Sequence, residues 1–129
     1  MKKSKKKIAI VGATLGLLLA GGAVQAGTTY SSYSTTVAPF NGSGYTSYQT
    51  KSTAGAYGNL RSTTVGGKYT VDARMQASSG TGGWVRSVTD SDSRNLPNSV
   101  AKGSSARVQF SNDASTPVNV QVTGTWRSN

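Results

Sequence analysis

The chain of 129 residues contains no cysteine, no histidine and no glutamate. Without cysteine there is no disulfide bond and no thiol nucleophile, and without histidine there is neither an imidazole base nor an imidazole metal ligand. A Ser-His-Asp triad cannot form, and a zinc site is not expected. We therefore predict that the protein is not an enzyme and has no cofactor. An aspartate-only hydrolase is the alternative, and its carboxylates would come from Asp72, Asp90, Asp92 and Asp113.

Lysine is scarce beyond residue 26, where only Lys51, Lys68 and Lys102 occur. A Ser-Lys catalytic dyad requires a buried lysine whose amine can lose its proton. All three lysines lie in polar, turn-like stretches of the sequence. The sequence therefore predicts that none of them is buried and that no such dyad forms.

Residues 1–26 have the three-part pattern of a secretory signal peptide. Five lysines in the first seven residues precede an apolar run over residues 8–19, and Val24 and Ala26 occupy the −3 and −1 positions of a small-residue cleavage site. The apolar run is shorter than the roughly 20 residues of a membrane-spanning helix. We expect cleavage between Ala26 and Gly27, membrane contact only during export, and release of residues 27–129 as a secreted, extracellular protein.

The predicted mature chain is moderately basic, with nine Lys and Arg residues against four Asp, a formal charge of +5. Such a charge attracts anionic polymers or anionic lipid, although it can also serve solubility alone. The basic residues are dispersed rather than clustered, so nucleic acid is not predicted as a partner. The absence of cysteine and the lysine-rich leader together favour a bacterial source, and a Gram-positive one in particular.

Alternation of apolar and polar residues with period two dominates the mature chain and is typical of half-buried strands. The clearest strands are predicted over residues 68–76, 106–110 and 117–127. Further strands are predicted over residues 28–37, 45–51, 60–65 and 84–88. About seven short strands predict an all-β fold, a small antiparallel β-sandwich or jelly roll in one domain over residues 27–129. An open barrel is the alternative.

Turn-forming residues suggest how these strands connect. Gly66-Gly67 is predicted to form a two-residue hairpin turn, and residues 111–117 a longer hairpin between the last two strands. Residues 78–83 are predicted to form a flexible loop. Residues 96–105 fit either a short strand or an irregular crossover.

Three arginines are predicted to point outward from their strands. Arg74 and Arg107 occupy polar positions of clear alternating stretches, and Arg86 lies in a further strand. If these strands are neighbours, the three side chains form a cationic stripe suited to phosphate or carboxylate groups, because a guanidinium group can bind them with two hydrogen bonds. The alternative is a solvated polar face with scattered charges.

Aromatic residues supply the other candidate ligand contacts, because exposed rings can stack on sugars. Tyr30, Tyr33, Tyr45 and Tyr48 are predicted to be exposed, and Trp84 to lie in the core or at its rim. Trp126 continues the inward pattern of Val118, Val120, Val122 and Gly124 and is predicted in the core, as is Tyr69. The predicted ligand-binding residues are Arg74, Arg86, Arg107, Tyr45, Tyr48 and Trp84.

Asp90 and Asp92 are the nearest pair of carboxylates in the sequence. They could hold Ca²⁺ in a loop, but Arg94 occupies a position that needs an oxygen ligand and no glutamate closes the loop. The alternative is an Asx turn in which these aspartates accept hydrogen bonds from local backbone amides and pair with Arg94. No metal site is predicted beyond this candidate.

Together these features predict a secreted binding module that engages an anionic cell-surface polymer or another extracellular partner. The alternative is a bacteriocin-like or toxin-like protein that acts on competing cells, although the mature chain lacks an amphipathic cationic helix. A structural role is a further alternative, in which a strand such as residues 28–37 pairs edge to edge with other copies.

Overall fold

The computed structural model describes residues 25–129. The predicted signal peptide lies outside the described residues, apart from Gln25 and Ala26. Within residues 25–129, no helix is long and apolar enough to span a membrane.

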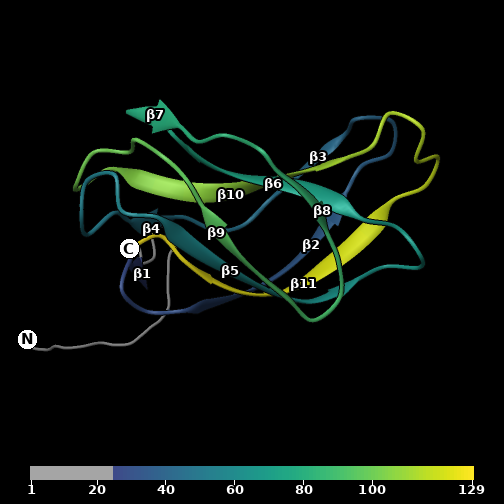
Figure 1. The fold of residues 1–129 in the computed structure, drawn as a ribbon, viewed down its shortest axis with the longest axis horizontal. Helices are drawn as coiled ribbons and strands as arrows, with labels where there is room; N and C mark the ends of the chain where they lie inside the picture. Colours follow the sequence, from purple (N-terminus) through teal and green to yellow (C-terminus); the bar gives the residue numbers. More distant parts are fainter. Residues whose placement is uncertain (1–24) are drawn as a thin grey trace, which may run out of the picture.

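The all-β prediction is confirmed, because the described residues form two sheets and no helix (Figure 1). Every strand pair is antiparallel except β1 and β4, which run parallel. The four-stranded sheet has the order β2 (Ser31–Val37), β11 (Val120–Arg127), β5 (Gly58–Val65) and β9 (Asp92–Leu96). The seven-stranded sheet contains β1 (Gln25–Ala26), β3 (Ser43–Tyr45), β4 (Gln49–Thr50), β6 (Val71–Ala77), β7 (Gly80–Thr81), β8 (Val85–Val88) and β10 (Ser105–Asn112).

Strands β6 and β10 form the centre of the seven-stranded sheet. They pair without interruption from Ala106 opposite Ala77 to Asn112 opposite Val71. Short strands cover both outer sides of this pair: β3 and β4 follow one another along β10, and β7 and β8 follow one another along β6. The long central pair therefore carries a continuous outer face that the short strands border.

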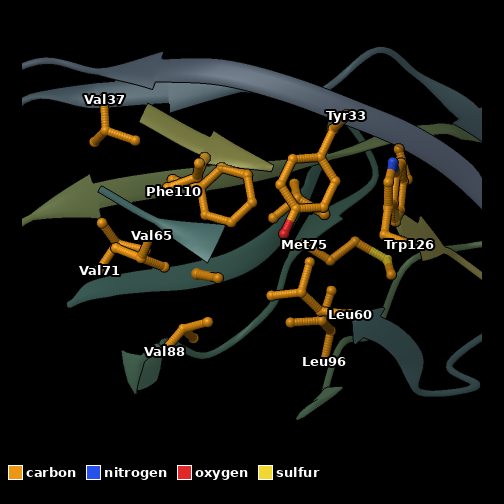
Figure 2. Close-up of a cluster of buried hydrophobic side chains, with 14 of the residues drawn as sticks. Tyr33, Val37, Leu60, Val65, Val71, Met75, Val88, Leu96, Phe110 and Trp126 are labelled. Carbon is orange, nitrogen blue, oxygen red and sulfur yellow. The ribbon is translucent and has the colours of Figure 1, made fainter. Parts of the chain in front are cut away.

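The inner faces of the two sheets share one apolar core (Figure 2). Met75 and Phe110 enter it from the seven-stranded sheet, and Leu60 and Trp126 enter it from the four-stranded sheet. Trp126 is only 1% exposed, which confirms its predicted place in the core. This burial of large apolar side chains drives the two sheets together, at about 25 cal/mol for each Å² removed from water.

The two predicted hairpins are wrong. Residues 66–70, which include Gly66-Gly67, connect β5 to β6, and residues 113–119 connect β10 to β11, but in each case the two strands belong to different sheets. Both connections therefore cross from one sheet to the other. Alternation shows which side chains face inward, and an inward face fits equally well in either sheet. Period-two patterns consequently cannot tell a hairpin from a crossing.

Several strand boundaries also differ from the prediction. The predicted flexible loop at residues 78–83 contains β7, which folds back onto the end of β6. The segment predicted to turn around Asp92 instead enters strand β9, which pairs with β5. Val118 was expected in the core but is 44% exposed, because β11 begins only at Val120.

Candidate ligand-binding face

The candidate site lies on the outer face of β6 and β10. Because Val71, Ala73 and Met75 point into the core, the alternate residues of β6 point outward, and the same holds for β10. The register then places outward residues in cross-strand pairs. These pairs are Asp72 with Ser111, Arg74 with Gln109, and Gln76 with Arg107.

Tyr45 and Tyr48 reach this same outer face because the predicted strand over residues 45–51 is interrupted. In an unbroken strand, residues three apart point to opposite faces. Here β3 ends at Tyr45, and Thr46 replaces the regular ladder: its amide donates to the Val108 carbonyl (3.1 Å) and its hydroxyl accepts from the Val108 amide (2.9 Å). Strand β4 resumes at Gln49, which points inward, so both tyrosines remain exposed.

Arg107 joins the two tyrosines. Its guanidinium carbon lies 3.9 Å from the ring centroid of Tyr45 and 5.1 Å from that of Tyr48. Its Nε donates to Oε1 of Gln76 at 2.9 Å. A guanidinium group within about 6 Å of a ring is attracted by the electrons of the ring face. Arg107 is therefore held by two rings and one amide, without an acidic partner among residues 25–129.

Arg74 repeats this arrangement on the neighbouring strand. Its guanidinium carbon lies 4.3 Å from the ring centroid of Trp84, and its Nε donates to Oε1 of Gln109 at 2.8 Å. Arg86 also approaches Trp84, at 5.8 Å, but it forms an ion pair with Asp72 at 2.6 Å. Arg86 is thus neutralised by a carboxylate, whereas Arg74 and Arg107 have no ion pair within residues 25–129.

Two glutamines link the arginines into one network. Gln76 donates to Oε1 of Gln109 at 3.4 Å, and Gln109 in turn donates to the Ser43 hydroxyl at 3.1 Å. Both arginines use only Nε in hydrogen bonds with the described residues. Their terminal nitrogens are therefore oriented by the protein and remain available to a ligand.

A hollow of about 430 Å³ adjoins Arg107 and Tyr48 on this face. Its volume falls within the range of about 300–1,000 Å³ that is usual for small-ligand sites. The hollow combines one ring, one guanidinium group and several small polar groups. The residues that line it are Tyr48, Gln76, Ala77, Ser78, Thr81, Ser105 and Arg107.

The structure brings together all six residues that the sequence singled out. We name this group of Arg74, Arg86, Arg107, Tyr45, Tyr48 and Trp84 the arginine-aromatic face. Sequence reasoning missed Gln76 and Gln109, although both occupy outward positions of the same strands as the arginines. That shared alternation is the signal that could have found them.

The other two tyrosines of the predicted exposed group lie elsewhere. Tyr33 is buried, and its ring centroid lies 5.1 Å from that of Phe110 in the core. The prediction that Tyr33 is exposed is therefore wrong. Burial raises the pKa of Tyr33 to about 12, and the nearby Ser62 hydroxyl lowers it in part, although neither hydroxyl has a hydrogen-bond partner of good geometry. Tyr30 lies against the other sheet.

The prediction that no lysine is buried is also wrong. Lys51 is only 1% exposed, and its Nζ donates to the backbone carbonyls of Ala56 (2.5 Å) and Ser128 (2.7 Å). Burial lowers the pKa of Lys51. The polar sequence around it hid this position, because the long side chain reaches inward from the end of β4.

Asp90 and Asp92 bind the protein's own groups. Asp90 accepts a hydrogen bond from the Val65 amide at 2.7 Å. Asp92 accepts from the Thr89 amide and from Arg94, both at 3.3 Å. Among residues 25–129 there is no cluster of three or more His, Cys, Asp or Glu side chains that could hold a metal ion. The contacts of Asp92 match the alternative of local amide contacts and pairing with Arg94, whereas Asp90 does not, because its partner Val65 is 25 residues away in the sequence.

Comparisons of the chain with protein-family models, curated proteins and solved structures found no match.

Proposed function

We propose that the protein is a secreted, non-enzymatic binding module of the β-sandwich type that engages an anionic cell-surface polymer of a Gram-positive bacterium. One observation carries the proposal: Arg74 and Arg107 stack on aromatic rings, have no acidic partner within the described residues, and lie on one face beside a hollow. The leader-like residues 1–26 and the predicted mature charge of +5 are consistent with it.

The arrangement suits a ligand that carries both anionic groups and sugar rings. The terminal nitrogens of Arg74 and Arg107 can bind phosphate or carboxylate with paired hydrogen bonds. The exposed ring of Tyr48 offers flat apolar surface next to those charges. Because Nε of each arginine is already fixed by a glutamine, less side-chain freedom is lost when a ligand binds.

The two arginines are placed to contact successive groups of one polymer strand. Arg107 lies opposite Gln76 in the register, and Arg74 is two residues from Gln76 on the same strand. Such diagonal neighbours are about 7–8 Å apart on a sheet face. A polymer that runs across β6 and β10 would meet both charges, and its ring units would meet the flanking aromatics.

The test is co-sedimentation of the purified protein with isolated Gram-positive cell walls across a salt titration. We expect binding that weakens with salt, because exposed charges are screened. Arg74→Gln combined with Arg107→Gln should reduce affinity by at least about tenfold, which corresponds to about 1.4 kcal/mol.

The matched control is Lys68→Gln combined with Lys102→Gln. Both lysines are exposed and lie off the arginine-aromatic face, and the control removes the same charge. An equal loss in both double variants would show that net charge alone governs binding. No association at low salt would refute the proposal, and killing of indicator strains would then favour the toxin-like alternative.

A further inference from the structure

Two further arginines that form no ion pair with the described residues lie against the four-stranded sheet. The ring of Tyr30 contacts two guanidinium groups, with its centroid 4.1 Å from the guanidinium carbon of Arg61 and 4.8 Å from that of Arg127. Tyr30 itself is fixed, because its hydroxyl donates to Oδ1 of Asn59 at 2.6 Å.

Strand alternation places this group on the outer face of the sheet. Leu60 and Trp126 are opposite one another in the register of β5 and β11, and both point into the core. Their neighbours in the chain therefore point outward: Asn59 lies opposite Arg127, and Arg61 lies one step further along β5. The two sheets share a core through their inner faces, so this outer face is on the opposite side of the molecule from the arginine-aromatic face.

The charges of this group are not compensated by the described residues. The ion pairs within residues 25–129 are those of Arg86 with Asp72 and of Arg94 with Asp92, and neither involves Arg61 or Arg127. In addition, Nε of Arg127 is buried and has no hydrogen-bond partner among the described residues, which is unfavourable for a cationic donor. Because this nitrogen is closed to solvent, an anion would bind through the terminal guanidinium nitrogens of Arg61 and Arg127.

We propose that Tyr30, Asn59, Arg61 and Arg127 form a second anion-binding site, which takes a phosphate or carboxylate group of a polyanion. Two such sites on opposite faces make one molecule bivalent. One protein then bridges two polymer strands, because a strand bound across β6 and β10 does not pass over the outer face of β5 and β11. The bridging of a cell-surface polymer rests on the proposed function, whereas the second site stands on its own geometry.

Bivalence changes what the protein does to a polymer. Once one face has bound, the other face meets further anionic groups at the high local concentration of the polymer, so weak individual contacts become effective. The expected outcome is a network in which protein molecules connect separate strands.

The test uses two probes at low ionic strength. Calorimetry with tripolyphosphate counts the sites, and turbidity with long-chain polyphosphate reports bridging. We expect two sites for the unchanged protein. Arg61→Gln, alone or with Arg127→Gln, should weaken one of them by at least about tenfold, and so should Arg74→Gln with Arg107→Gln. Each change should abolish turbidity while the remaining site still binds.

The outcomes separate the two proposals. If Arg61→Gln leaves both the site count and the turbidity unchanged, the second site does not exist. If Arg61→Gln removes a site but Arg74→Gln with Arg107→Gln changes nothing, the second site stands and the proposed arginine-aromatic face fails. Arg61 is exposed, so Arg61→Gln should fold normally, and circular dichroism checks this for each variant. The lysine double variant described above controls for net charge.

Discussion

The side-chain cations have different hydrogen-bond partners in two regions, the end of β4 and the arginine-aromatic face. At the end of β4, Lys51 is buried and its Nζ is bonded to backbone carbonyls. On the arginine-aromatic face, Arg74 and Arg107 donate hydrogen bonds to the described residues only through Nε, and their guanidinium groups stack on aromatic rings. A buried cation that is bonded to carbonyls of its own chain stabilises the fold. An arginine that is held in place through Nε alone keeps its terminal nitrogens free to donate hydrogen bonds to a ligand.

The largest expected effect is on stability and comes from replacing the buried Lys51. Lys51→Ala should lower the free energy of unfolding by about 3 kcal/mol or more, because it opens a cavity and leaves the Ser128 carbonyl without its donor. The Ala56 carbonyl keeps a second donor, Asn98, at 2.9 Å. Denaturant unfolding measures the change. Lys51→Met, which retains most of the stem, should recover part of it, and an unchanged stability for Lys51→Ala would contradict a structural role.

The next effect is the dependence of stability on pH. Tyr33 ionises near its ordinary pKa of 10 when unfolded but at about 12 when folded. Above pH 10 the unfolded state loses the proton first, so stability should fall between pH 10 and 12 by roughly 2–3 kcal/mol. Lys51 acts with the opposite sign: its folded pKa is lowered, so its contribution rises with pH up to its unfolded value of 10.5.

Two variants separate these contributions. In chemical unfolding as a function of pH, Tyr33→Phe should remove the alkaline fall and retain the rise due to Lys51. Lys51→Met should remove the rise and retain the fall. An alkaline fall of full size in Tyr33→Phe would mean that another group causes it.

The smallest of the three effects is on the affinity for cell walls and comes from replacing Arg107 on the arginine-aromatic face. Arg107→Lys keeps the positive charge but loses the planar group that stacks between Tyr45 and Tyr48 and that can bind an anion with two hydrogen bonds. We expect the affinity for cell walls to fall several-fold, which is a smaller loss than the one expected for Arg74→Gln with Arg107→Gln. The free energy of unfolding should change by no more than about 0.5 kcal/mol. Undiminished affinity would show that charge alone is recognised.

Thr123→Ala is the control for that experiment. It removes a hydroxyl that is already paired with Thr64 at 2.6 Å on the outer face of the four-stranded sheet. Nearby, Thr36 donates to Gln121, and Gln121 donates to Ser34. Because these hydroxyl and amide groups bond to one another, we expect the affinity for cell walls to stay unchanged.

Alternation in the sequence was sufficient to predict much of this architecture. The outward positions of Arg74 and Arg107 follow from their apolar neighbours, and so does the buried position of Trp126. Alternation could not show which strands pair with one another. It therefore missed the crossings after β5 and β10, and it could show only conditionally that β6 and β10 are neighbours.

The remaining differences arise where one side chain changes the backbone pattern or reaches past it. Thr46 replaces part of the ladder and thereby turns Tyr48 to the same side as Tyr45. Lys51 reaches backbone carbonyls that are remote in the sequence, as far as Ser128. Neither event leaves a mark on local composition, because each depends on groups brought near only by the folded chain.

The surroundings of Gly27 have a consequence for when the predicted leader could be removed. Gly27 is buried, its carbonyl accepts a hydrogen bond from the Asn129 amide at 2.9 Å, and residues 25 and 26 pair with β4. A peptidase needs an extended, accessible bond, and the expected cleavage point between Ala26 and Gly27 is closed once the end of β11 has docked. If the predicted leader is removed, cleavage must therefore come before β11, the last of the described strands to be synthesised, has docked. Folding would then set a time limit on the predicted proteolysis.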